Sequence, residues 1–187
     1  KTELGGVLMT QAIHQHDLFT YLMGDIKRLF GRVATRVNTI EVEDCVTASL
    51  ELASGALGSF TATLGSADEI TRIRLAFENV SFESDHAPYN PGAKPWKILP
   101  RSPETAERIA ALLENWQHVP PRFTTQMARF HDALTGKAPL PVTSADSRRA
   151  LELVTAFYHS SVTHEDVELP IGPEHARYRS WVPAEFA

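Results

Sequence analysis

Apolar and polar residues alternate in five short runs of this chain, and each run predicts a strand. In the first two runs Val, Ala, Leu or Phe alternates with Ser, Thr or Glu, and Ser54-Gly55 supplies the turn between them. Glu78-Asn79 supplies a second such turn. Alternation of this kind is typical of strands with one buried face, and strands joined by short turns are antiparallel neighbours. The predicted strands are 46–52, 57–64, 70–77, 80–83 and 167–171.

Apolar residues that recur every three or four positions predict four helices. Gly24 and Gly136 stand where the first and third helices would end, Ser102-Pro103-Glu104 begins the second with a capping residue, and Pro120-Pro121 would end it. The predicted helices are 11–23, 103–116, 123–134 and 143–162. The periodic residues are Ile13, Asp17, Leu18, Tyr21 and Leu22 in the first, Phe123, Met127, Phe130 and Leu134 in the third, and Leu151, Val154, Tyr158 and Val162 in the last.

Amphipathic helices and a sheet with one apolar face bury most surface when the helices lie on that face. We therefore expect an α+β fold of two layers, with a mostly antiparallel or mixed sheet covered by helices on one side and open on the other. The chain reads as a single domain in which residues 86–121, rich in Pro, form a variable insertion. The polar residues of the open face would be Thr47, Ser49, Thr61, Thr63, Arg72 and Arg74.

The composition adds limits on partners and location. With 18 Lys and Arg against 23 Asp and Glu among 187 residues, the net charge of −5 disfavours nucleic acid and anionic membranes as partners. A single cysteine, Cys45, excludes an intrachain disulfide, and we expect it to be a small buried residue. Because no disulfide is expected, the reducing cytoplasm is the expected location. There is also no run of about 18 apolar residues that could span a bilayer. The chain begins Lys1-Thr2-Glu3 without Met, which indicates a piece of a longer protein.

The densest cluster of reactive side chains lies in the first predicted helix. Thr10, His14 and Asp17 follow one another at i, i+4 and i+7, so a hydroxyl, an imidazole and a carboxylate share one helical face. A histidine beside a carboxylate suits general acid/base chemistry near neutral pH. The alternative is that His14 is a hydrogen-bonded core residue, because apolar residues share this face.

The pair His14 and His16 does not predict a metal site. On a helix the two side chains point about 200° apart and cannot share one ion. We expect His16 to be a solvated surface residue. No glycine-rich phosphate loop is present, because Gly5-Gly6 is isolated and Gly55-x-x-Gly58 is a turn between strands. Trp96, in a Pro-rich segment, is expected either to pack or to line a pocket.

Several stretches, in their order and spacing, resemble the C-terminal domain of the Gfo/Idh/MocA family of NAD(P)-dependent oxidoreductases. The most extensive stretch runs Gly-Gly-Val-Leu-Met-Thr-Gln-Ala-Ile-His-x-x-Asp-Leu from Gly5 to Leu18. The others are 41–44 (Glu-Val-Glu-Asp), 55–59 (Gly-Ala-Leu-Gly-Ser), 130–134 (Phe-His-Asp-Ala-Leu) with Gly136, 141–161, and 167–171 (Val-Glu-Leu-Pro-Ile).

This resemblance implies that NAD or NADP is bound mainly by an N-terminal Rossmann domain outside this chain, which also supplies a lysine from a Glu-Lys-Pro motif. It implies that His14 relays the proton during hydride transfer and that Asp17 orients the helix or His14. Thr10 stands where many members have Asp or Asn, so we expect it to hydrogen-bond substrate. The expected substrate-binding residues are Thr10, Gln11, His14 and Trp96, and this chain holds no cofactor-binding or metal-binding residue.

The resemblance also implies function and assembly. The expected protein is an oxidoreductase acting on a sugar, polyol or related hydroxyl compound, of which this chain alone is inactive. The open sheet face would pack on a second copy in a homodimer or higher oligomer, with Glu51 near Arg72 or Arg74. Two alternatives stay open: a non-enzymatic binding or assembly module, which the Thr10 substitution favours, and a family member that uses transient oxidation for hydrolysis or elimination.

Overall fold

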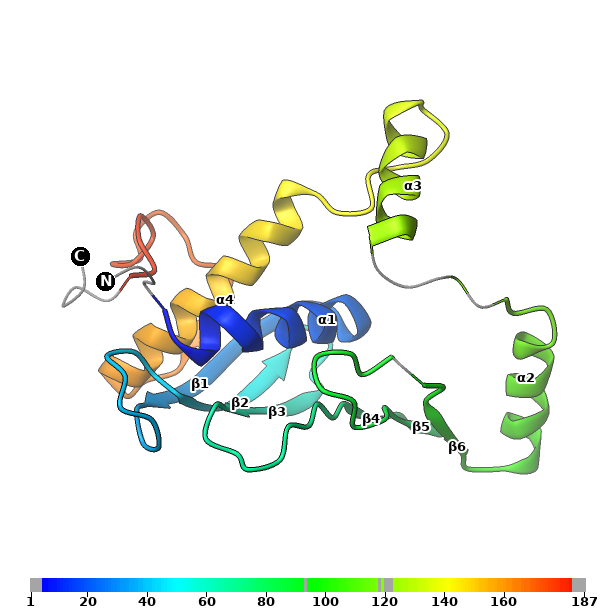
Figure 1. Cartoon of the computed structure of the whole chain (residues 1–187), viewed down its shortest axis with the longest axis horizontal. Helices are drawn as coiled ribbons and strands as arrows, with labels where there is room; N and C mark the ends of the chain where they lie inside the picture. The colour runs from blue at the N-terminus through cyan, green and yellow to red at the C-terminus, as the bar shows by residue number, and fades with distance from the viewer. Residues whose placement is uncertain (1–4, 93, 118, 120–122, 183–187) are drawn as a thin grey trace. The chain divides into compact units, whose positions relative to one another are not determined.

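A computed structural model of the chain describes residues 5–92, 94–117, 119 and 123–182. The chain divides into two compact units, Lys1–Asp68 with Ser144–Ala187 and Glu69–Thr143, and each is described by itself (Figure 1). The predicted Pro120-Pro121 helix end and the terminal Lys1-Thr2-Glu3 lie outside the described residues.

The first unit contains a four-stranded antiparallel sheet in the order β3-β2-β1-β7. Strands β2 (Cys45–Leu52) and β3 (Leu57–Thr63) confirm the predicted hairpin, whereas the predicted strand 167–171 is reduced to β7 (Val167–Glu168). Strand β1 (Ile26–Ala34) was not predicted, although it lies between β2 and β7. A register irregularity between Ile26 and Arg28 breaks its alternation, which hides it from a period-two pattern.

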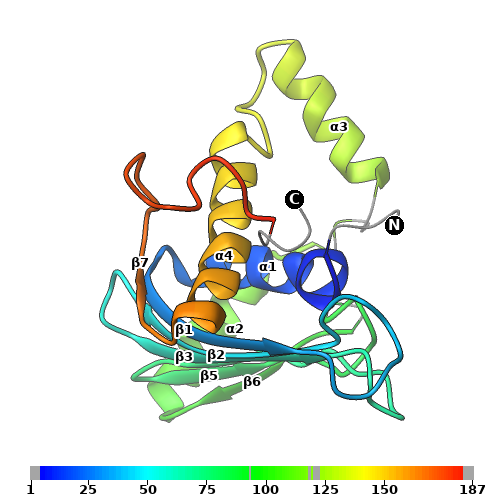
Figure 2. The same ribbon diagram turned by 90° about the vertical axis from the view of Figure 1, so that its left-hand side faces the viewer.

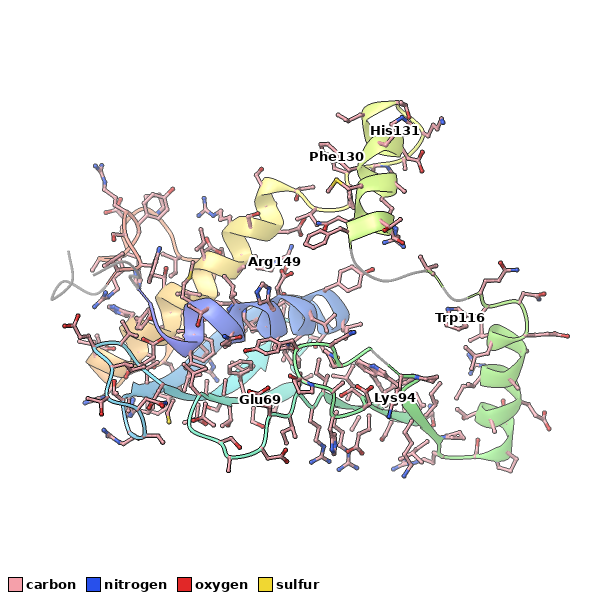
Figure 3. The ribbon with its side chains drawn as sticks, viewed as in Figure 1. Glu69, Lys94, Trp116, Phe130, His131 and Arg149 are labelled. Atoms are coloured by element: carbon pink, nitrogen blue, oxygen red, sulfur yellow. The ribbon has the colours of Figure 1, made fainter. Side chains whose placement is uncertain are left out.

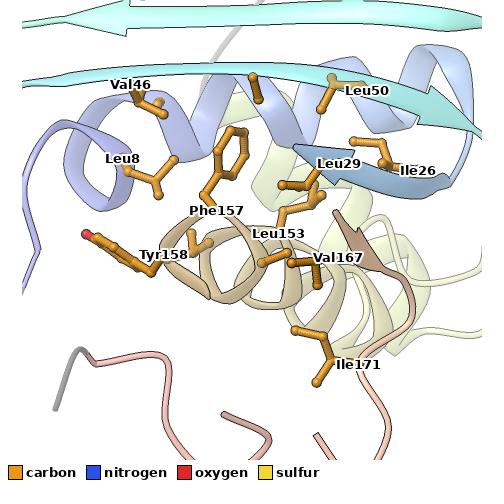
Figure 4. Packing of buried hydrophobic residues seen from close by; sticks show 14 of the residues in the cluster. Leu8, Ile26, Leu29, Val46, Leu50, Leu153, Phe157, Tyr158, Val167 and Ile171 are labelled. Atoms are coloured by element: carbon orange, nitrogen blue, oxygen red, sulfur yellow. The ribbon is translucent and has the colours of Figure 1, made fainter. Parts of the chain in front are cut away.

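One face of this sheet is covered by helices, as expected for a two-layer α+β fold. A π-helical segment, η1 (Leu8–Ala12), leads directly into α1 (Ile13–Met23), and α4 (Ser144–Thr163) packs across β1 beside it (Figure 2). The buried side chains between these layers form one cluster (Figure 4). Its members are Val7, Leu8, Ala12, Ile26, Leu29, Val46, Ala48, Leu50, Leu153, Val154, Ala156, Phe157, Tyr158, Val167 and Ile171.

The helical faces differ from those predicted. In α1 the buried residues are His16 and Thr20, while Tyr21 is 81% exposed. In α4 the predicted Val154 and Tyr158 are buried, together with Leu153 and Phe157, whereas Leu151 and Val162 are exposed. The periodicity therefore found part of the buried face of α4 but selected the wrong face of α1.

Serines of α4 complete the hydrogen bonding of β1 beyond the short β7. The Ser160 hydroxyl accepts the Gly31 N–H at 2.9 Å and donates to the Glu165 carbonyl at 2.6 Å, and the Ser161 hydroxyl accepts the Val33 N–H at 3.0 Å. Gly31 permits this approach, because a Cβ there would lie 3.0 Å from the Phe157 ring. The contact between α4 and β1 is therefore polar as well as apolar.

The opposite face of the sheet carries the residues that alternate with the core-facing ones along β2 and β3. Thr47 lies opposite Thr61 with their hydroxyls 3.2 Å apart, and Ser49 lies opposite Ser59. Cys45 is on this face and half-buried, with its Sγ 3.3 Å from the Thr63 hydroxyl, so the expectation of a buried cysteine was wrong.

The second unit contains a three-stranded antiparallel sheet in the order β4-β5-β6 and two helices. The strands are β4 (Arg74–Ala76), β5 (Val80–Glu83) and the unpredicted β6 (Lys97–Pro100). Helix α2 (Pro103–Leu113) begins as predicted, because the Ser102 hydroxyl accepts the Thr105 N–H. Helix α3 (Phe123–Leu134) matches its predicted bounds, yet neither helix contains a buried residue, and Phe130 of the α3 stripe is 43% exposed (Figure 3). None of the described helices is long and apolar enough to cross a membrane.

Candidate active site

The side chains of Thr10, His14 and Asp17 are all exposed on the first helical segment. His14 and Asp17 are three residues apart in α1 and therefore share one face, and Thr10 precedes His14 by about one turn. Tyr21 continues the row one turn further on. His14 is not the core histidine of the alternative interpretation, because its side chain is exposed.

The hydroxyl of Thr10 is already engaged within the helix. Thr10 Oγ1 donates a hydrogen bond of 2.8 Å to the Gly6 carbonyl. A hydroxyl has one proton and two acceptor lone pairs, so with this bond in place Thr10 can only accept a hydrogen bond from a ligand. The structure therefore fits Thr10 as an acceptor for a ligand hydroxyl and not as a base.

His16 is buried, which corrects the expectation of a solvated residue. Its side chain is 2% exposed, and its ring lies 6.4 Å from the rings of both Phe60 and Phe157. Neither ring nitrogen has a hydrogen-bond partner within the described structure. Burial, with a smaller effect from His14, lowers the pKa of His16 to about 4, so the imidazole is neutral at physiological pH. Its position follows from the rotation of α1, which places residue 16 toward the sheet.

The remaining predicted site residues lie in different parts of the chain. Gln11 is half-buried in η1, beside Thr10 in sequence. Trp96 belongs to the second unit, is half-buried, and donates its indole N–H to the Pro91 carbonyl at 2.7 Å. The ring of Trp96, and not its N–H, is thus the part that could contact a ligand.

Glu43 anchors the start of the site helix, a role that the sequence did not reveal. One carboxylate oxygen, Oε1, accepts the N–H groups of Gly6 at 3.1 Å and Leu8 at 3.0 Å and the hydroxyl of Tyr158 at 2.9 Å. The Glu43 carbonyl accepts the Val7 N–H at 2.9 Å. The only signal in the sequence was an acidic pair, Glu43-Asp44, directly before a strand.

Asp44 organises the connection between β1 and β2 in a similar way. Its carboxylate accepts the backbone N–H groups of Arg36 and Val37, each at 2.8 Å, and of Asn38 at 2.6 Å. These bonds hold the pKa of Asp44 well below its usual range. Two adjacent acidic residues therefore fix two different segments, the site helix and the β1–β2 loop.

A cavity of about 460 Å³ lies at the other end of α1. It is lined by Thr20, Asp25, Ile26, Lys27, Ala53, Ala145, Arg148, Arg149, Glu152, Leu153, Leu169 and Pro170. Its arginines have acidic partners: Arg148 pairs with Glu152 at 2.8 Å, and Arg149 (Figure 3) pairs with Asp25 at 3.1 Å. The cavity includes neither His14 nor Asp17 and is separate from the candidate site.

We tested whether the described residues and the sequence fit a metal or a dinucleotide. Among the described residues no three His, Cys, Asp or Glu side chains come together in a metal-binding group. The sequence has neither a Gly-x-Gly-x-x-Gly nor a Glu-Lys-Pro motif. The pyrophosphate of a dinucleotide normally sits on such a glycine-rich turn, so the residues of this chain do not fit a self-contained NAD site.

Comparison with known proteins shows what this chain is similar to. Residues 1–83 match the family model described as GFO/IDH/MocA C-terminal domain. The WlbA dehydrogenase from Bordetella pertussis, solved with NADH and UDP-GlcNAcA, is 23% identical with a TM-score of 0.68 over 90% of this chain and 46% of that one. The corresponding enzyme from Chromobacterium violaceum is 26% identical with a TM-score of 0.71 over 90% and 47%.

A third similar structure is the aldose-aldose oxidoreductase from Caulobacter crescentus complexed with glycerol, which is 19% identical with a TM-score of 0.69 over 88% of this chain and 48% of that one. No curated protein matches the sequence. The fold of this chain is thus similar to part of each of these structures, and the chain spans a little under half of their length. The first 83 residues are thus similar to the GFO/IDH/MocA C-terminal domain.

Proposed function

We propose that this chain is the substrate-binding half of an NAD(P)-dependent oxidoreductase that acts on a hydroxyl group of a sugar, polyol or related compound. The observation that carries the proposal is the row of exposed polar side chains, Thr10, His14 and Asp17, in a segment that is similar to the GFO/IDH/MocA C-terminal domain. The similar structures solved with NADH, UDP-GlcNAcA or glycerol support the substrate class.

The residues of the row have complementary roles. Oxidation of a carbinol requires removal of the hydroxyl proton, and His14 accepts that proton in oxidation and returns it in reduction. Asp17, one turn along the same face, orients the helix or the imidazole of His14. Thr10 accepts a hydrogen bond from a neighbouring substrate hydroxyl, which fixes the orientation of the carbinol.

The cofactor is held outside this chain. A nicotinamide supplies the hydride acceptor, and its binding requires a Rossmann domain that precedes these residues in the full-length protein. The isolated chain of 187 residues is therefore inactive. NAD(P)⁺ reduction by this chain alone would contradict the proposal.

We also propose that the open face of the first sheet mediates a homodimer. Glu51 already pairs with Lys27 at 3.1 Å and Arg28 at 2.6 Å, and Arg72 pairs with Glu83 at 2.7 Å. Because these in-chain pairs satisfy the charges of Glu51 and Arg72, Ser and Thr side chains that lie opposite each other, such as Ser49 and Ser59, provide most of the contact between the two copies. The same face on both copies suits a two-fold interface. Arg72 and Arg74, which were expected on this face, belong to the second unit, and the strand that contains Arg74 is in the other sheet.

The test is reduction of NAD⁺ and NADP⁺ by the full-length protein with a panel of UDP-sugars, aldoses and polyols. Turnover with one of these classes, lost in His14→Gln, is the expected result. Binding without any redox change would favour the non-enzymatic module, which Thr10 supports because its proton is committed to Gly6. A hydrolysed or eliminated product without net NADH would favour transient oxidation.

A further inference from the structure

The start of the site helix has no cap of its own. The first N–H groups of any helix lack partners within the helix and need acceptors from elsewhere. Val7 occupies the cap position and makes no side-chain bond, and glycines 5 and 6 have no side chains to offer. The N–H groups of Gly6, Val7 and Leu8 instead all bond to Glu43, some 35 residues further along the chain.

The backbone of Gly6 packs directly against the backbone of Glu43. A Cβ on Gly6 would overlap the carbonyl oxygen of Glu43, so only glycine can occupy that position. Glu43 is 8% exposed, and its Oε1 is the shared acceptor of donors from both helices. Tyr158 remains a donor because burial, with the nearby Glu43 charge, raises the pKa of its phenol above the usual value.

The residues directly after this anchor form a π-helix and not an α-helix. A π-helix contains more residues per turn and is less favourable than an α-helix, so it persists only where tertiary contacts hold it. The π segment Leu8–Ala12 begins at the last anchored amide, contains Thr10 and ends two residues before His14. Relaxation to an α-helix would remove the extra residue of the turn and rotate Thr10 relative to His14 about the helix axis.

We propose that Glu43 is a positioning residue for the active site: its bonds to the amides of Gly6 and Leu8 hold the π turn that sets the orientation of Thr10 relative to His14. The inference rests on the proposed function of the Thr10 and His14 pair. Glu43 itself contacts no substrate in this scheme.

The test compares Glu43→Gln with Asp44→Asn, a matched loss of one buried carboxylate charge on the neighbouring residue. Asp44 holds the 36–38 loop and not the helix, so both variants lower stability but only the first alters the helix start. In the 187-residue chain we expect Glu43→Gln to speed amide exchange at Gly6 and Leu8 about tenfold and to move the backbone chemical shifts of residues 8–12. Asp44→Asn leaves these signals unchanged.

In the full-length protein, Glu43→Gln is expected to lower kcat about tenfold while the KM for the dinucleotide stays unchanged, and Asp44→Asn to leave kcat unchanged below its Tm. Unchanged exchange and chemical shifts in Glu43→Gln would overturn the proposal, as would an unchanged kcat despite altered shifts. If the wild-type protein proves to have no redox activity, the proposed function fails, while the exchange and shift measurements still decide whether Glu43 holds the π turn.

Discussion

The phenol of Tyr158 donates a hydrogen bond of 2.9 Å to Oε1 of Glu43, although the two residues lie 115 positions apart in the chain. The same oxygen accepts the amides of Gly6 and Leu8. Helix α4, the residues before β2 and the start of the site helix therefore meet at one carboxylate. In the proposal above, these tertiary contacts set the orientation of the candidate catalytic face.

Gly6→Ala is expected to destabilise the fold by about 1–3 kcal/mol or more, because the added methyl overlaps the backbone of Glu43 and forces the helix start to move. Urea denaturation measures the loss. Gly172→Ala is the control, since a Cβ there meets nothing within 4 Å and its effect should stay within about 0.5 kcal/mol. Equal stabilities for the two variants would contradict the close contact.

His16 makes stability depend on pH in a defined window. The folded state holds its pKa at about 4, below the 6.5 of an exposed histidine, so the unfolded state binds more protons between these values. Stability is thus fully present above about pH 6.5 and falls by about 3 kcal/mol as the pH approaches 4. Denaturation of His16→Leu should lack this fall, whereas a variant of an exposed histidine, His131→Gln, should keep it. Parallel pH curves for wild type and His16→Leu would show that the ring is not buried.

Ser160→Ala is expected to cost about 1–3 kcal/mol, because it leaves the buried Gly31 N–H without its acceptor. Thermal or urea unfolding measures the change. The exposed Ser59, on the open face, supplies the control Ser59→Ala, which should have little effect on monomer stability. A neutral Ser160→Ala would mean that this N–H is satisfied in another way.

Ser49→Arg is expected to weaken the proposed homodimer strongly, since Ser49 lies between Phe30 and Ser59 on the open face and its replacement puts two like charges into a two-fold contact. Sedimentation equilibrium measures the dissociation constant. Thr39→Arg places the same charge in an exposed loop and should leave the dimer intact. A wild-type chain that stays monomeric at high concentration would exclude this interface.

The sequence predicted those parts of the fold whose pattern is local. Strands β2 and β3 alternate cleanly, and α2 carries its own capping signal at Ser102, so both were found. Strand β1 was missed because its irregular start conceals the period. The residues of the candidate row could be named in advance, but the burial of His16 depends on which side of α1 meets the sheet. The role of Glu43 depends on contacts between distant segments, which no local pattern contains.

The most direct test of the central proposal is the kcat of His14→Gln in the full-length protein, measured as NADH formation with the substrate class found in the panel. The account predicts a loss of about 10²–10⁴-fold, as expected for removal of a general acid/base, with the dinucleotide KM unchanged and His131→Gln fully active. Wild-type turnover in His14→Gln would contradict the account.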